Sequence, residues 1–133
     1  MTARFLDSNV ILYLIEPGDT RSDTAERVVL AGGTISVQVL NEVLVNAIRK
    51  KGLTWDQAGA FLGHVRSRLS IVPLTEAVHD RGRWAAERHR LSVYDGMILG
   101  AALEAGCDEV LSEDMQDGLV VDGRLTVRNP FAA

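Results

Sequence analysis

The stretch SVYDGMILGAALEAGCDEVLSED, residues 92–114, predicts a buried helix followed by a strand. Ser92 is expected to begin the helix as its N-cap, and Gly106 to end it. The helix is apolar on most of its surface, so we expect it to lie inside the domain. The strand covers residues 109–112, and a polar turn containing Asp114 follows it. A buried helix that leads directly into a strand is typical of an α/β domain.

The same alternation of helices and strands extends from this stretch to the rest of the chain. Helices are expected from Val10 through Leu14 to Pro17-Gly18, then over about residues 20–31, 37–51, from Thr54 onward, 75–90 and 92–105. Further strands are expected at residues 4–6, 34–36, 70–73 and 125–127. This alternation predicts an α/β fold with a mainly parallel sheet. Since no linker or repeat divides the sequence, residues 1–133 are expected to form a single domain.

The composition is that of an ordinary globular protein, with 47% hydrophobic and 24% charged residues. No apolar run approaches the length that spans a bilayer, and the first residues lack a signal-peptide pattern, so we expect a cytoplasmic protein without membrane contact. Cys107 is the only cysteine, which excludes an internal disulfide and a thiolate metal cluster. We interpret it as a packing residue.

Four acidic residues stand where an apolar segment meets a turn or a helix end: Asp7, Glu42, Asp95 and Asp114. Asp7 and Asp114 both follow strands, and the carboxyl ends of parallel strands lie along one edge of a sheet. In open α/β sheets, ligands bind at that edge, where the strand order reverses. Carboxylates brought together repel each other unless a cation lies between them. Convergence of the four acids would therefore indicate a divalent metal site.

Each acid taken alone also has an ordinary structural explanation. Asp7 is suited to an N-cap, Glu42 to a solvated helix surface, Asp95 to a capping box with Ser92, and Asp114 to a turn. The argument for a site therefore rests on all four meeting at one edge. We expect three neighbouring side chains to support them, and the role of a fifth acid, Asp117, stays open. The three supporting residues are Ser8, Asn9 and Ser112.

The net charge of -4 does not by itself suggest a nucleic-acid partner, because phosphate binding usually requires a basic surface. Without the four acids, however, the remaining chain would be neutral. An acidic total is therefore compatible with RNA binding if metal ions neutralise the acids.

The sequence resembles PIN-domain ribonucleases, and among them the VapC-type toxins of bacterial type II toxin–antitoxin pairs. The resemblance covers nearly the whole chain and rests on four segments. These are FLDSNVILY at residues 5–13, SVQVLNE at 36–42, LSVYDGMILGAALEAGCDEVLSEDMQDG at 91–118, and VRNPF at 127–131.

The resemblance implies a three-layer α/β/α domain whose acids bind Mg²⁺ or Mn²⁺ and cleave RNA. By position, Asp7, Glu42, Asp95 and Asp114 correspond to the family's four acids, which makes them the expected catalytic and metal-binding residues. Gly96 stands where many relatives carry Ala, which should affect helix packing more than chemistry. The resemblance also implies a cognate antitoxin and a homodimer as partners.

Other classes of protein also place an Asp after a first strand. Haloacid-dehalogenase-like phosphatases need a second Asp two residues later, where this chain has Asn9, and response-regulator receivers need a lysine after a late strand. The only lysines are Lys50 and Lys51, so both classes are disfavoured. The main alternative to a nuclease is a PIN-fold module that binds RNA or protein without cleaving.

Overall fold

A computed structural model describes residues 2–132 of the chain. The six strands are β1 (Arg4–Leu6), β2 (Thr34–Ser36), β3 (Ser70–Val72), β4 (Glu109–Leu111), β5 (Val120–Val121) and β6 (Leu125–Arg128). The six helices are α1 (Ser8–Leu12), α2 (Thr20–Leu30), α3 (Val37–Arg49), α4 (Trp55–Arg66), α5 (Glu76–His89) and α6 (Val93–Glu104).

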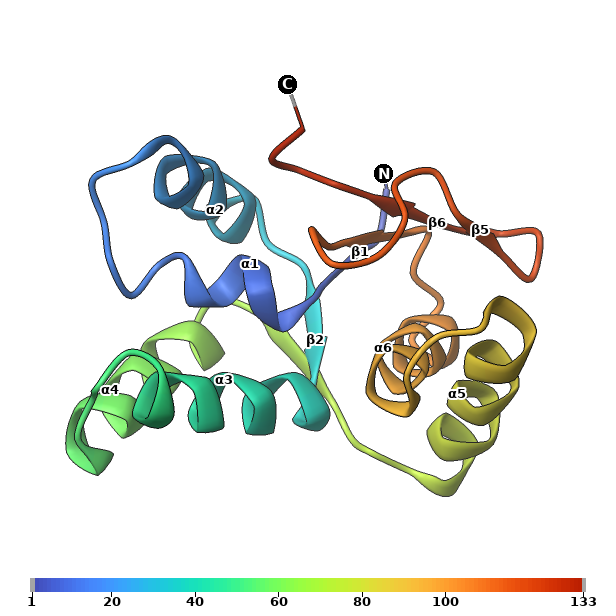
Figure 1. The fold of residues 1–133 in the computed structure, drawn as a ribbon, viewed down its shortest axis with the longest axis horizontal. Coiled ribbons are helices and arrows are strands. Elements are labelled where there is room, and N and C mark those ends of the chain that lie inside the picture. The colour runs from blue at the N-terminus through green and yellow to red at the C-terminus, as the bar shows by residue number, and fades with distance from the viewer. Residues whose placement is uncertain (1, 133) are drawn as a thin grey trace.

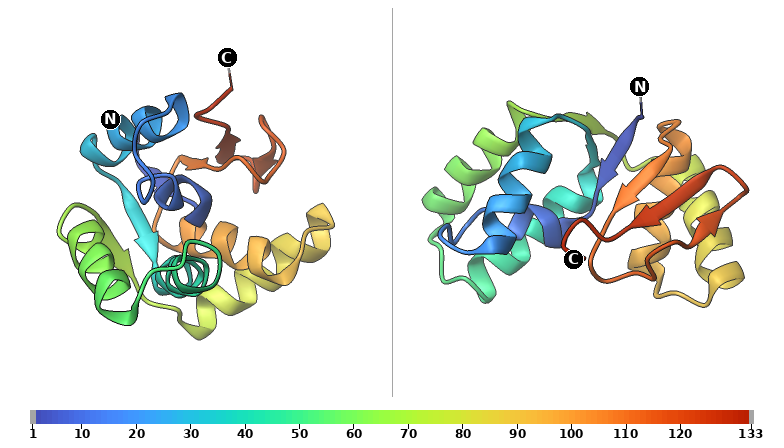
Figure 2. Two further views of the ribbon diagram at one scale, coloured as in Figure 1. Left: turned by 60° about the vertical axis from the view of Figure 1, so that its left-hand side comes forward. Right: turned by 90° about the horizontal axis from the view of Figure 1, so that it is seen from above.

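The strands form one sheet in the order β3-β2-β1-β4-β6-β5. Every neighbouring pair is parallel except β5 and β6, which run antiparallel at one edge. The helices pack around this sheet as a three-layer α/β/α domain (Figure 1, Figure 2). The predicted α/β fold with a mainly parallel sheet is therefore confirmed.

The strand order changes direction at β1 and β4. The chain moves outward from β1 to β2 and β3, and then returns across the sheet to β4. Because such crossovers are right-handed, α1 to α4 belong to one face of the sheet and α5 and α6 to the other. The two groups occupy opposite halves of Figure 1. The strand order reverses between β1 and β4, which is where α/β sheets bind their ligands.

The core contains residues from the strands and from all six helices, and α6 is the most completely buried helix. Phe5, Ile35 and Val110 are fully buried on neighbouring strands. All eight residues from Gly96 to Leu103 are buried, as the apolar sequence of this helix predicts. Cys107 lies just after α6 and is 3% exposed, so it packs inside the domain.

Three glycines allow α5 and α6 to pack with their backbones in close contact. A Cβ added to Gly100 would lie 2.5 Å from the backbone nitrogen of Gly82 and 2.7 Å from the carbonyl oxygen of Val78. A Cβ on Gly96 would lie 2.5 Å from the carbonyl oxygen of Gly82. Real Cβ contacts are not this short, so alanine at these positions would force the helices apart. The effect expected for Gly96 thus falls on the α5–α6 contact.

The structure differs from the prediction at two elements. The first helix was expected to continue through Leu14, but α1 ends at Leu12 because the next amides bond three residues back, Leu14 N to Ile11 O and Ile15 N to Leu12 O. Strand β5 was not expected, although Asp122-Gly123 is a strong hairpin signal. Both residues have positive φ, 53° and 66°, and turn the chain from β5 into β6.

Within residues 2–132, every helix is too short or too polar to cross a lipid bilayer.

Candidate active site

Asp7 is the buried centre of the site. It follows β1 as the N-cap of α1, and only 2% of its surface is exposed. Its Oδ1 accepts a hydrogen bond from the Ser8 backbone N–H at 2.7 Å. Its Oδ2 accepts from the Ser112 hydroxyl at 2.8 Å and from the Asn9 amide at 3.2 Å. The residue is therefore both a helix cap and a carboxylate fixed by three donors.

The electrostatic state of Asp7 reflects its burial among other acids. Burial raises the pKa of this carboxyl to about 7, against the hydrogen bonds from Ser112 and Ser8, which lower it. The charges of Glu42 and Asp95 raise it further. A buried carboxylate whose nearest charges are also negative favours either a proton or a cation.

Glu42 reaches the site from the surface of α3. It is half-buried. The Ser8 hydroxyl donates to its Oε1 at 3.0 Å, and the Gln38 amide donates to its Oε2 at 2.9 Å. Ser8 therefore links two acids, because its backbone N–H is bonded to Asp7 and its hydroxyl to Glu42.

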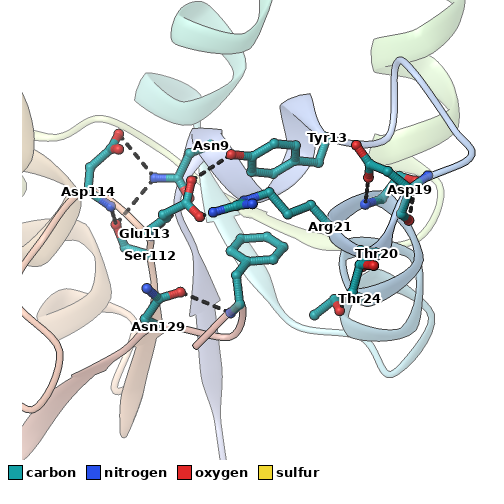
Figure 3. A network of polar contacts seen from close by, with 12 residues as sticks. Asn9, Tyr13, Asp19, Thr20, Arg21, Thr24, Ser112, Glu113, Asp114 and Asn129 are labelled. Carbon is teal, nitrogen blue, oxygen red and sulfur yellow. Dashed lines mark hydrogen bonds and ion pairs between the residues drawn. The ribbon is translucent and has the colours of Figure 1, made fainter. Parts of the chain in front are cut away.

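Asp114 lies in the turn after β4, and its carboxylate accepts a hydrogen bond from the side-chain amide of Asn9 (Figure 3). The Asn9 amide nitrogen is 3.2 Å from Oδ2 of Asp7 and 3.2 Å from Oδ2 of Asp114. The Asp114 backbone N–H donates to the Ser112 hydroxyl at 3.2 Å, and Ser112 in turn donates to Asp7. Two side chains therefore connect both acids, although Asp114 itself is exposed.

Asp95 enters the site from the first turn of α6. Its backbone N–H donates to the N-cap hydroxyl of Ser92 at 3.1 Å, which is one half of the expected capping box. Burial and the nearby charge of Asp114 raise the pKa of Asp95, while a hydrogen bond with Ser92 lowers it. Shared hydrogen-bond partners therefore link Asp7 to Glu42 and to Asp114, whereas Asp95 is related to the other acids only through the effect of their charges on its pKa and of its charge on that of Asp7. Asp117 instead accepts the backbone N–H of Asn129 at 2.9 Å.

A second cluster adjoins the site and was not anticipated from the sequence. The Tyr13 hydroxyl donates to Oε1 of Glu113, and Nε of Arg21 donates to Oε2 of Glu113 at 2.9 Å (Figure 3). The hydrogen bond from Tyr13 lowers the pKa of Glu113. The Glu113 backbone N–H donates to the side-chain oxygen Oδ1 of Asn9 at 3.1 Å, and Phe131 packs edge-on against Tyr13. This cluster therefore helps to hold Asn9, which joins Asp7 to Asp114, in place.

The donor chemistry of the four acids suits a hard divalent cation. Carboxylate oxygens are the ligands that Mg²⁺ and Mn²⁺ prefer. Among residues 2–132, no three Asp, Glu, His or Cys side chains are arranged as a ready metal cluster. The neutral donors Asn9 and Ser8 lie between the acids instead.

The protein is an α/β domain with acidic residues near the point where the strand order reverses. The family model for the PIN domain matches residues 4–116. The chain therefore belongs to the PIN domain family. No curated protein sequence matches the chain.

Solved structures with the same fold include toxins from bacteria. The chain is 20% identical to a chain of a toxin–antitoxin complex from Klebsiella pneumoniae, with a TM-score of 0.75, covering 98% of this chain and 100% of that one. It is 20% identical to VapC20 of Mycobacterium tuberculosis, a sarcin-ricin loop cleaving toxin, with a TM-score of 0.68 and coverage of 84% and 92%. VapBC2 from Rickettsia felis, bound to a promoter DNA fragment, gives 18% identity, a TM-score of 0.68 and coverage of 96% and 100%.

Proposed function

We propose that this protein is a VapC-type toxin that cleaves RNA in the cytoplasm as a Mg²⁺- or Mn²⁺-dependent endoribonuclease. The observation that carries the proposal is the placement of Asp7. It is buried at the strand-order reversal, joined to Glu42 through Ser8 and to Asp114 through Asn9. Membership in the PIN domain family and the toxins among its structural neighbours support the same conclusion.

Asp7, Glu42, Asp95 and Asp114 are the residues that would hold the cation. When bound, a divalent cation supplies the positive charge that acidifies water and offsets the negative charge growing on phosphate oxygens during in-line attack. Asp7 is held in one orientation by Ser8, Asn9 and Ser112. Glu42 and Asp114 lie nearer the solvent, which suits either of them to orient the attacking water and accept its proton. The products should carry a 5′-phosphate and a 3′-hydroxyl.

Cleavage of RNA by the purified protein tests this proposal. We expect cleavage with Mg²⁺ or Mn²⁺, none with EDTA, and losses of at least about 100-fold in Asp7→Asn and Asp95→Asn, since even indirect metal partners contribute roughly 10- to 100-fold. Asp56→Asn, a change in the first turn of α4 outside the site, serves as the control. Equal cleavage by the wild type and both site variants would disprove the metal site.

The alternative is a PIN-fold module that binds RNA or protein without cutting it. The presence of all four acids disfavours this alternative, because a module that only binds has no use for carboxylates that repel phosphate. Binding of RNA without metal-dependent cleavage of any RNA offered would favour it.

We further propose a cognate antitoxin and a homodimer as partners. Toxin–antitoxin complexes among the structural neighbours support the first. Co-expression with a short DNA-binding protein encoded next to this chain should yield a stable complex that blocks cleavage. A single monomeric mass by size-exclusion chromatography with light scattering, at every concentration, would contradict the homodimer.

A further inference from the structure

A groove lies beside the acids, between the exposed surface of α3 and the first turn of α6. Its volume is about 470 Å³, within the range of small-molecule sites. Glu42 belongs both to this groove and to the acid site, so the two are continuous. We call it the α3–α6 groove. It is lined by Gln38, Asn41, Glu42, Val45, Asn46 and Tyr94.

The apolar part of the α3–α6 groove is an aromatic ring and a valine in contact with solvent. Tyr94 is 67% exposed and Val45 is 48% exposed. Tyr94 shares the groove with Glu42, which is one of the four acids. Unstacked bases of single-stranded RNA bind on exposed aromatic rings of this kind.

The polar part of the groove consists of three carboxamides on one side of α3. Gln38, Asn41 and Asn46 all belong to α3 and line the groove. The Gln38 side-chain amide donates to the Glu42 carboxylate, and the Asn46 side-chain amide donates to the Glu42 backbone carbonyl oxygen. Within residues 2–132, the side-chain carbonyl oxygens of Gln38 and Asn46 accept no hydrogen bond. Over the same residues, the Asn41 side chain makes no hydrogen bond. A free carboxamide can pair with adenine through one donor and one acceptor.

The lining favours a base over a second protein as the occupant. The core of a protein–protein interface is depleted in charged residues, whereas Glu42 forms part of this groove. Covering that carboxylate with an apolar partner would bury an unpaired charge at a high cost. A base stacked on Tyr94 would cover the ring and could leave the Glu42 carboxylate open to solvent.

We propose that the α3–α6 groove binds one base of the RNA substrate beside the cleaved bond, and prefers adenine to uracil. Tyr94 stacks on the base, and Asn41 pairs with its edge. This inference rests on the proposed ribonuclease function, since it names the specificity of the same site. The preference comes from stacking, because the larger adenine covers more of the Tyr94 ring than uracil does, whereas a carboxamide such as that of Asn41 can pair with either base.

Two measurements test the groove. Sequencing the ends of cleaved RNA should place adenine at one fixed position relative to the cut for wild type. This preference should disappear in Tyr94→Ala, and Asn41→Ala should lower cleavage at all sites. Fluorescence anisotropy with short oligoadenylate and oligouridylate, using Asp7→Asn to prevent cleavage, should show tighter binding of oligoadenylate. Tyr94→Ala should weaken that binding roughly 5- to 150-fold, whereas Tyr94→Phe keeps the ring and should bind like the parent.

Trp55→Ala is the matched control, because Trp55 is an aromatic residue 71% exposed on α4, outside the groove. Asn41→Ala changes only an exposed helix side chain, so it remains informative if Tyr94→Ala fails to fold. Equal binding of the two oligonucleotides, or no effect of either groove variant, would overturn the inference. Conversion of a dimer to a monomer by Tyr94→Ala would also overturn it and identify the groove as a subunit interface. Tyr94-dependent preference for oligoadenylate without cleavage would uphold the groove and refute the nuclease.

Discussion

At the scale of single residues, Asn9 determines how Asp7 and Asp114 are placed relative to each other. Its amide group has two N–H donors, and three acceptors lie within reach: Asp7 Oδ2, Ser112 Oγ and Asp114 Oδ2. Its carbonyl oxygen is held in turn by the backbone of Glu113. An aspartate at this position would lose the donors and add a further negative charge, so the amide is the chemically suitable group.

We predict that Asn9→Ala lowers the cleavage rate and weakens Mn²⁺ affinity by roughly 10- to 100-fold, the usual cost of losing a residue that orients metal ligands. The acids would keep their positions in the chain but lose the bridge between them. RNA cleavage and Mn²⁺ titration calorimetry measure the two effects. Gln116→Ala, an exposed amide in the same turn as Asp114, should leave both unchanged. Unaltered Mn²⁺ affinity in Asn9→Ala would show that Asn9 does not orient the acids.

Some of these contacts could be predicted from the sequence and others could not. The meeting of Asp7 with Ser112 follows from two parallel strands that end at one edge. The Tyr13–Glu113–Arg21 cluster had no comparable signal. Glu113 lies about 100 residues from Tyr13 and Arg21 in the chain, and all three are residue types that are common on protein surfaces. Only the fold brings them together.

At the scale of elements, the close contact of α5 and α6 sets the position of Asp95. Asp95 is the third residue of α6, and α6 is held against α5 through Gly82, Gly96 and Gly100. A change in the spacing between these helices would therefore move an acid of the site relative to Asp7.

We predict that Gly100→Ala lowers the free energy of unfolding by about 1–3 kcal/mol, the usual cost of overpacking. The added Cβ would meet backbone atoms of Gly82 and Val78, which cannot rotate away as a side chain could. Urea unfolding measures the change. If α6 shifts to relieve the contact, cleavage should also fall.

Gly59→Ala provides the control for this prediction. Gly59 lies inside α4, and a Cβ there would meet nothing within 4 Å. Alanine should stabilise an open helix position by about 0.5–1 kcal/mol relative to glycine. A loss of stability in Gly59→Ala as large as in Gly100→Ala would show that packing is not the cause.

The sequence predicted whether a segment is a helix or a strand more accurately than the residues at which the segment begins and ends. The apolar pattern of Val10, Ile11 and Leu14 suits a longer helix than α1, and only the tight turn after Leu12 ends it early. Strand β5 has two residues, too few to show a period of its own.

At the scale of the whole molecule, the buried charge of Asp7 links the stability of the domain to pH. Its pKa is about 7 in the folded state and 3.8 for an ordinary Asp. Below pH 3.8 both folded and unfolded chains are protonated at this position, so the residue has no ionisation cost. Between these values only the unfolded chain ionises, so stability falls as pH rises, and the loss is complete above about 7.

We predict that the stability of metal-free Asp7→Asn relative to wild type increases by about 1.4 kcal/mol per pH unit between about pH 4 and 7, and is level above that. Asparagine cannot ionise, so it avoids the cost. Thermal unfolding in EDTA across this range measures the difference. Mn²⁺ should stabilise wild type but not the variant at neutral pH. A difference that is constant with pH would show that Asp7 ionises as readily in the folded chain as in the unfolded one.

The overall topology could be anticipated only in part. Alternating helices and strands predicted a mainly parallel sheet and an edge along which Asp7 and Asp114 would meet. The order in which the strands lie was not predictable, because short strands of similar apolar composition carry little information about their neighbours. That order places the reversal between β1 and β4, directly at the two acids.

Because Cys107 is buried, its rate of reaction with a thiol reagent can report local opening of the domain. The thiol is 3% exposed, and burial raises its pKa, so it is both shielded and poorly reactive in the folded chain. As the only cysteine, it yields one adduct with a thiol reagent. Because it lies just after α6, the labelling rate should follow how often that helix and β4 separate. Each variant's local opening could thus be timed in native buffer, without denaturant.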